Sequence, residues 1–233
     1  DIASTPTDVT ARNVVLARAQ EMSGRFRNAQ AQIDDLQQGV NGQLNDAVRS
    51  VNSLASRIGD LNGQIQRAQG GGQQPNDLLD QRDELVRQLN SQVQASTVAA
   101  SDGSLNIFVG SQALVLGNTT QTIGVEPSAT DPTRMSLILN RGSTKMDITN
   151  STTGGELGGL IRYRKVTLDP SLNELGRVAL VVADAINSQL AQGIDKNGEF
   201  GASLFADINS AAAISQRSIA KAGNSAGSGN LDV

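Results

Sequence analysis

Carboxylates are the side chains of this chain best suited to acid–base chemistry, because the sequence contains no histidine and no cysteine. Two clusters stand out: the pair Asp34 and Asp35, and the group of Asp80, Asp83 and Glu84. Two carboxyl groups that flank a bond can hydrolyse a glycoside. Both clusters fall in segments with helical periodicity, where adjacent residues point apart, and the sequence indicates no pocket around them. A solvated helix face is the favoured interpretation, and we predict no catalytic site.

Other motifs with chemical potential are weaker still. The glycines at 70–72 are not followed by the lysine of a phosphate-binding loop, so a flexible corner is favoured. "DKNGE" at 195–199 matches part of a calcium loop but lacks its further acids, which favours a plain turn. "NTT" at 118–120 and "NST" at 150–152 match a glycosylation acceptor that occurs often by chance. We therefore expect a protein that is not an enzyme, with no cofactor and no metal site.

The composition favours packed helices and argues against two classes of partner. Hydrophobic residues make up 38% of the 233 positions, aromatic residues 2%, and there is no tryptophan, so a core of leucine, isoleucine, valine and alanine is expected. The formal net charge of −4 gives nucleic acid no electrostatic attraction. We also expect no membrane insertion, because no apolar run is long enough to span a bilayer. The sequence begins at Asp1 rather than methionine, so we expect the natural ends to lie beyond it.

A very long helix is the strongest structural pattern. "TPTD" at 5–8 is typical of a helix start, with Thr5 as cap and Pro6 in the first turn, and no further proline occurs before Pro75. Apolar residues then step by threes and fours, at Val15, Ala19, Met22, Phe26, Ala29, Ile33, Leu36, Val40, Leu44, Val48, Val51, Leu54, Ile58, Leu61 and Ile65. One continuous helix of about 58 residues would be roughly 85 Å long.

The heptad pattern has one irregularity. Between Leu36 and Leu44 it shifts by four residues, which is a stutter that locally unwinds a supercoil, and Gly39 and Gly42 lie there. The alternative interpretation is therefore two ordinary helices with a turn near 39–42.

A second helix is expected after the glycine corner. Asn76 is the predicted cap, with Asp77 and Asp80 in the first turn, and Asp83 and Arg87 form a favourable i,i+4 pair. The face that packs on the first helix comprises Leu78, Leu79, Leu85, Val86, Leu89 and Val93.

From about Thr97 the pattern changes to the alternation of strands. Asp102–Gly103 predicts a hairpin turn, Gly110–Ser111 a second bend, and further strands are expected at 121–126, 134–139 and 145–149. The segment 97–150 is therefore predicted to be a small antiparallel β element.

A helical pattern returns after this element. Leu168, Leu172, Leu175, Ala179, Val182 and Ile186 form another heptad stripe. Pro170 either starts this helix, with Asp169 as cap, or kinks a longer helix that begins near Glu156. We predict that the stripe from Leu44 to Ile65 and the stripe from Leu168 to Ile186 face one another as the internal seam.

Five ordered segments together resemble one known family. They are "LNGQIQRAQGGGQQPNDLLDQRDELVRQLNSQV", "SDGSLNIFVGSQALVLG", "GGELGGL", "LDPSLNELGRVA" and "INSQLAQGIDKNGEFG". Over residues 8–209 the chain resembles the flagellar hook-associated protein 1 (FlgK) family of flagellin-like axial proteins. The resemblance implies a mainly α fold, an elongated helical rod or bundle (the flagellin-like core domain) with antiparallel β-hairpins.

The resemblance also implies an organisation and a function. Residues 1–204 would be the rod core domain and 205–233 the start of an outer β domain or a linker, truncated here, and the terminal polymerisation helices are missing. The protein would be a structural subunit of the hook–filament junction of the bacterial flagellum, outside the cell, exported by the flagellar secretion apparatus. Its partners would be the hook protein, other hook-associated proteins, further copies in the full-length protein, and an export chaperone for the missing C-terminal part.

Two alternatives remain open from the sequence. One is another axial subunit that shares the rod, flagellin or a protein like hook-associated protein 3. The other is a coiled-coil secreted effector or adhesin. The segment "PNDLLDQRDEL" and the strands after it favour the hook-associated protein 1 family.

Overall fold

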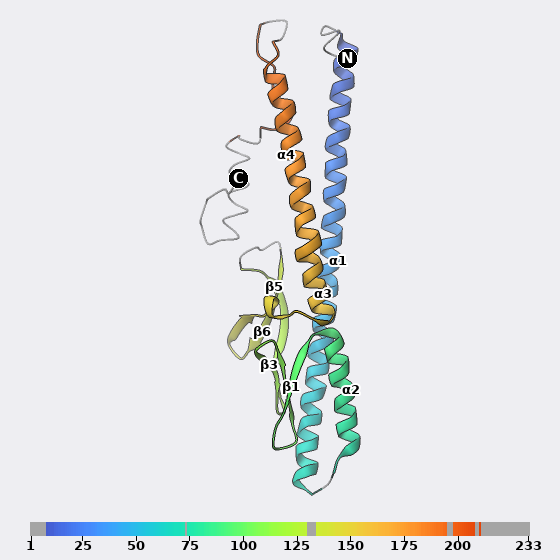
Figure 1. Cartoon of the computed structure of the whole chain (residues 1–233), viewed down its shortest axis with the longest axis vertical. Coiled ribbons are helices and arrows are strands. Elements are labelled where there is room, and N and C mark those ends of the chain that lie inside the picture. The colour runs from blue at the N-terminus through green and yellow to red at the C-terminus, as the bar shows by residue number, and fades with distance from the viewer. Residues whose placement is uncertain (1–7, 73, 130–133, 195–197, 208–209, 211–233) are drawn as a thin grey trace. The chain divides into compact units, whose positions relative to one another are not determined.

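The computed structural model describes residues 8–72, 74–129, 134–194, 198–207 and 210 (Figure 1). Backbone contacts divide the chain into two compact units. Unit 1 comprises Asp1–Gln38 and Thr167–Ile219, and unit 2 comprises Gly39–Val166 and Ala220–Val233. The predicted outer β domain or linker at 205–233 lies almost wholly outside the described residues.

The first helix, α1, is one continuous helix of 62 residues, Val9–Gly70. The prediction of a single long helix is confirmed, and the alternative with a turn near 39–42 is wrong. Gly39 and Gly42 lie inside the helix, where a glycine costs about 1 kcal/mol relative to alanine but does not end it. The predicted cap residues Thr5 and Pro6 lie outside the described residues. At the observed start, the Asp8 carboxylate accepts the backbone N–H of Thr10 at 2.8 Å.

The second helix, α2, spans Asn76–Gln92 in unit 2. Asn76 is its first helical residue rather than its cap, because Pro75 takes the cap position and its carbonyl accepts the N–H groups of Leu78 and Leu79. The predicted pairing of Arg87 is also wrong. Its guanidinium bonds Glu84, three residues earlier, instead of Asp83. Of the predicted apolar face, Leu85, Leu89 and Val93 are fully buried, and Leu78, Leu79 and Val86 are half-buried.

Two small antiparallel sheets follow in unit 2. Sheet A has the order β1 (Ala95–Ala99), β2 (Leu105–Val109), β3 (Gln112–Leu116) and β4 (Thr119–Thr120). Sheet B has the order β5 (Thr122–Pro127), β6 (Met135–Arg141) and β7 (Thr144–Asp147). The β1–β2 turn contains Gly103 at φ 81°, a conformation that glycine adopts without strain. The predicted small antiparallel β element is confirmed.

After the sheets, the chain is helical without a break from Gly155 to Ala191. After the short 3₁₀ turn η1 (Thr149–Ser151), α3 (Gly155–Tyr163) passes through a π-helical segment η2 (Arg164–Leu168) into α4 (Asp169–Ala191). Pro170 therefore lies within a longer helix, as the second of the two predicted alternatives required. A proline has no N–H to donate and its ring crowds the carbonyl four residues earlier, so the wider π turn immediately before it relieves that conflict.

The predicted seam between the two heptad stripes is wrong. The stripe from Leu44 to Ile65 belongs to unit 2 and is buried there, beside α2 and the sheets (Figure 1). The stripe from Leu168 to Ile186 belongs to unit 1, where Leu168 of η2 is buried but α4 has no fully buried residue. Periodicity identifies the face of a helix that packs, but it carries no information about which element packs on it. The predicted fold class, mainly α with a small antiparallel β element, is confirmed.

Candidate functional site

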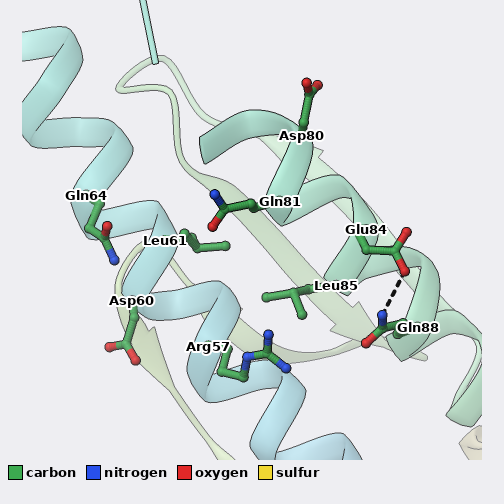
Figure 2. A pocket seen from close by; sticks show the side chains of 9 residues that line it. All are labelled: Arg57, Asp60, Leu61, Gln64, Asp80, Gln81, Glu84, Leu85 and Gln88. Atoms are coloured by element: carbon green, nitrogen blue, oxygen red, sulfur yellow. Dashed lines mark hydrogen bonds between the residues drawn. The ribbon is translucent and has the colours of Figure 1, made fainter. Parts of the chain in front are cut away.

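The carboxylates singled out in the sequence lie on open helix surfaces. Asp34 lines a shallow hollow in unit 1 and the adjacent Asp35 is exposed, as expected for neighbours on a helix. Asp80 and Glu84 line a groove between α2 and α1 together with Asp60 (Figure 2). Hydrogen bonds from Gln88 and Arg87 lower the pKa of the Glu84 carboxyl group. The acid of a glycosidase needs the opposite shift, so the electrostatics of Glu84 do not suit it to that role.

The α1–α2 groove is long and shallow. Its volume is about 570 Å³, with Leu61 and Leu85 between the two helices and polar side chains along both rims (Figure 2). A second hollow of about 560 Å³ shares Gln88 with it and continues toward Ser53 and Gln92. An apolar floor with glutamine, serine and charged rims is the surface of a helix pair, without convergent groups that would hold a small molecule. Among the described residues, no cluster of three or more acidic side chains is placed to bind a metal ion.

A cluster of buried hydrogen bonds in unit 2 centres on Asn62 of α1, which is fully buried. Its Nδ2 donates to the carbonyls of Leu105 at 2.9 Å and Gly117 at 2.7 Å. Its Oδ1 accepts the N–H of Leu105 at 3.0 Å and Nη1 of Arg82 at 3.2 Å. One amide thus satisfies both backbone groups of Leu105 and joins α1, α2 and sheet A.

Arg82 brings the second helix into this junction. Its side chain is 8% exposed, and Nη1 also donates to the carbonyl of Gly103 in the β1–β2 turn at 2.8 Å. Burial lowers the pKa of its guanidinium, yet an arginine stays charged in proteins. Its hydrogen-bond partners are neutral oxygens of the turn and of Asn62, and the carboxylate of Asp83 also stabilises the charge. We call Asn62 and Arg82, with the backbone atoms they bind, the junction site.

Two further asparagines on helices also bind backbone N–H and C=O groups through their side-chain amides. Asn52 on α1 accepts the N–H of Ile123 and donates to its carbonyl, both at 2.8 Å, and so attaches sheet B to the helix. Asn187 on α4, in unit 1, accepts the N–H groups of Leu204 and Phe205 at 2.9 and 3.0 Å and donates to the carbonyl of Phe205 at 3.0 Å. Asn62 and Asn52 each pair with both backbone groups of one strand residue, as a neighbouring strand would, whereas Asn187 binds the bend at Leu204 and Phe205.

The turn between β1 and β2 is attached to α1 at a second point. Gln66 donates Nε2 to Oδ2 of Asp102 at 2.6 Å, and Oδ1 of Asp102 accepts both the N–H and the hydroxyl of Ser104. The hydrogen bonds from Ser104 are the main cause of the lowered pKa of the Asp102 carboxyl group. The arrangement fixes where the hairpin contacts the helix and offers no reactive group.

The asparagines and Arg82 were missed in the sequence, although a pattern was available. Asparagine is a poor helix former, so its presence inside a long helix needs a reason. Asn62 lies between Leu61 and Ile65 of the apolar stripe, where a polar residue must find partners when it is buried.

Comparisons with known proteins agree with this architecture. The model of the flagellar hook-associated protein FlgK helical domain matches residues 1–205. Flagellar hook-associated protein 1 of Salmonella typhimurium is 34% identical over 209 residues, which cover 88% of this chain and 38% of that protein. The Escherichia coli K12 protein of the same name is 33% identical with the same coverage, and the Bacillus subtilis one is 27% identical over 88% of this chain and 45% of its own length.

A solved structure gives the same result. The structure of the flagellar hook junction protein FlgK from Burkholderia pseudomallei superimposes with a TM-score of 0.80 and 35% identity, covering 87% of this chain and 37% of that one. The chain therefore spans less than half the length of the relatives it matches. With its helical domain matched over residues 1–205, the chain belongs to the flagellar hook-associated protein FlgK family.

Proposed function

We propose that this chain is the helical domain of a structural subunit at the hook–filament junction of a bacterial flagellum, an adaptor between two polymers. The observation that carries this proposal is the match to the FlgK helical domain over residues 1–205, with relatives named hook-associated protein 1 and a junction protein of the same fold. These relatives favour it over flagellin, a protein like hook-associated protein 3, an effector or an adhesin.

The geometry supports a mechanical rather than a chemical role. In unit 2, the buried side chains of Asn62 and Arg82 attach sheet A and α2 to α1. The carboxylate cluster of α2 is exposed to the groove, and the pKa of Glu84 is lowered. We therefore infer that the protein is not an enzyme and works by transmitting force between neighbouring subunits.

The organisation and partners follow from the same proposal. Residues 1–204 would form the core domain and 205–233 would begin an outer domain or a linker. The full-length protein would contact the hook protein, other hook-associated proteins and further copies of itself, outside the cell, with an export chaperone acting on its C-terminal part. A chain without cysteine, and so without disulfides, suits export as an unfolded polypeptide.

A chimera tests the proposal directly. The matched segment of hook-associated protein 1 in Salmonella typhimurium would be replaced by this chain, and the gene introduced into a strain that lacks its own copy. We expect the deletion strain to carry hooks without filaments, and the chimera to restore filaments and swimming, scored by electron microscopy and motility agar. A deletion strain with intact filaments would favour the effector or adhesin. A stable, exported chimera that restores no filament would contradict the junction role.

A further inference from the structure

The central asparagine of the junction site is followed directly by a glycine, Gly63. Asparagine is a thermolabile residue, and it loses ammonia most readily before glycine, which has no side chain to shield its backbone nitrogen. The chain contains three such pairs, at 41–42, 62–63 and 197–198. Residue 197 lies outside the described residues, so the structure compares the two pairs of α1.

The reaction is a cyclisation within the chain followed by hydrolysis. The backbone nitrogen of Gly63 attacks Cγ of Asn62, so that a nitrogen–carbon bond forms. The bond from Cγ to Nδ2 breaks, and ammonia leaves with the proton of the Gly63 N–H. Water then opens the succinimide ring at one of its two carbonyls. The product is aspartate or, when Cβ has become part of the main chain, isoaspartate, and the reaction needs no reagent other than water.

The folded structure blocks this reaction at Asn62. Inside α1 the N–H of Gly63 is directed toward the carbonyl four residues earlier, and its nitrogen cannot approach Cγ. The Asn62 side chain is fully buried, and its amide is held by hydrogen bonds with Leu105, Gly117 and Arg82. The reactive geometry therefore requires α1 to open and sheet A to separate from it. In an unfolded chain neither restraint remains.

The product cannot rebuild the junction site. Nδ2 donates to the carbonyls of Leu105 and Gly117 at 2.9 and 2.7 Å, whereas a carboxylate only accepts hydrogen bonds. Aspartate would direct a buried oxygen at these two carbonyl oxygens and leave both without a donor. An ion pair with Arg82 offsets part of this loss but restores neither donor. Isoaspartate adds an atom to the main chain and so breaks the hydrogen-bond register of α1.

We propose that Asn62–Gly63 is a deamidation site that reacts only in the unfolded chain and that excludes the modified chain from the folded state. The unfolded chain loses ammonia there, and the junction site of the product does not close. The folded chain resists the reaction, because only the open state reacts. This inference goes beyond the proposed function and is tested in the purified chain, without a flagellum.

The second pair of α1 provides a matched comparison. Asn41 is half-buried, and its Oδ1 has no hydrogen-bond partner among the described residues, so it does not join elements as Asn62 does.

Both glycines have room for alanine. A Cβ at Gly42 meets nothing within 4 Å. At Gly63 the nearest atoms are Nη1 of Arg67 at 3.5 Å and Cβ of Asn118 at 3.6 Å, which are ordinary van der Waals distances. Alanine also favours helix and shields the backbone nitrogen. Gly42→Ala and Gly63→Ala should therefore fold and should each slow deamidation of the preceding asparagine.

Ageing of folded and unfolded chains tests the site. Wild type and Gly63→Ala are kept at neutral pH in buffer and in guanidinium chloride, and peptide mapping by mass spectrometry follows conversion at Asn41 and Asn62. In denaturant, Gly63→Ala should slow conversion at Asn62 and leave Asn41 unchanged. In buffer, Asn62 of wild type should convert at least about a hundredfold more slowly than in denaturant. Equal rates in the two solvents, or a rate in denaturant that Gly63→Ala does not change, overturn the proposal.

The effect of the modification on folding is tested separately. Asn62→Asp should lower the melting temperature by at least about 10 °C, and Asn41→Asp by no more than about 2 °C. Gly42→Ala aged in denaturant and then diluted should refold only in the fraction with an intact Asn62, separated by size exclusion and mapped by mass. The double variant with Gly42→Ala and Gly63→Ala, aged equally, should refold like a fresh chain. An Asn62→Asp protein as stable as wild type overturns the proposal, as do modified chains that enter the folded fraction in their starting proportion.

Discussion

The two halves of α1 have the same heptad spacing and very different burial. In the second half Leu44, Val51 and Ile58 are at most 1% exposed. In the first half Val15 and Leu36, which occupy equivalent positions of the pattern, are 39% and 51% exposed.

The difference follows from what each half packs on within its own unit. The second half has α2 on one side and both sheets on the other, attached through Asn52 and Asn62. The first half meets α4 along a hollow of about 380 Å³ lined by residues such as Phe26 and Leu175. Heptad spacing thus specifies the face of a helix, and the number of partner elements sets how deeply that face is buried.

The largest effect should come from a charge in the buried half. Ile58→Asp places a carboxylate where the side chain is fully buried, so we expect a loss of more than about 4 kcal/mol in the free energy of unfolding. Urea titration followed by circular dichroism measures the loss, and hydrogen exchange should locate it in residues 39–166.

The matched control is the same change in the exposed half. Val14 is 54% exposed, so Val14→Asp should alter the free energy of unfolding by no more than about 0.5 kcal/mol. If the two variants are equally destabilised, burial does not distinguish the halves of α1.

The next largest effect concerns the junction site. Asn62→Leu fits the apolar stripe but removes one of the two partners of Arg82 and the partner of both backbone groups of Leu105, so we expect a loss of about 3 kcal/mol. The same substitution at the exposed Asn45, on the same helix, should cost less than about 0.5 kcal/mol. Urea unfolding of both variants gives the comparison, and a stable Asn62→Leu protein would mean that packing alone holds sheet A on α1.

The sequence predicted the elements better than it predicted their contacts. The long helix, the hairpins and the returning helix follow from local periodicity and turn residues, which are properties of neighbouring positions. The pairing of stripes does not, because Leu44–Ile65 and Leu168–Ile186 have the same apolar pattern and nothing local says that α2 and the sheets cover the first. The junction site joins Asn62, Arg82 and Leu105, whose distances along the chain hide their contact.

Two glycines of α1 differ in how closely other elements approach them, and the expected effect is smaller. Gly59 lies in the buried half, and a Cβ built there would come within 2.7 Å of Cγ2 of Thr120 in β4. Gly59→Ala should therefore lose about 1 kcal/mol despite the better helix propensity of alanine. At Gly39 a Cβ meets nothing within 4 Å, so Gly39→Ala should gain about 0.5–1 kcal/mol. Thermal melts of the two single variants test the opposite signs, and two shifts of the same sign would contradict the close contact at Gly59.

The smallest expected effects concern two carboxyl groups, one in each unit, whose contributions to stability should depend differently on pH and salt. In unit 1, hydrogen bonds from Arg25 and Arg18 lower the pKa of Glu21. In unit 2, hydrogen bonds from Ser104 and Gln66 lower the pKa of Asp102. A carboxyl group whose pKa is lower in the folded state stabilises the fold at neutral pH, and this contribution is lost as pH falls through the folded pKa. Wild type should thus exceed Glu21→Gln and Asp102→Asn in stability at pH 7, and both differences should shrink below about pH 4.

Salt then distinguishes the two carboxylates. The partners of Glu21 are exposed cations three and four residues away on the same helix, so 1 M NaCl should remove most of the difference between wild type and Glu21→Gln. The partners of Asp102 are a neutral hydroxyl, a backbone N–H and an amide, so the difference for Asp102→Asn should persist in salt. Urea unfolding at pH 7 and pH 3, in low and high salt, measures all four differences. If salt abolishes the effect at Asp102 as well, its lowered pKa has a coulombic origin and the hairpin is not held to α1 by the Gln66 amide.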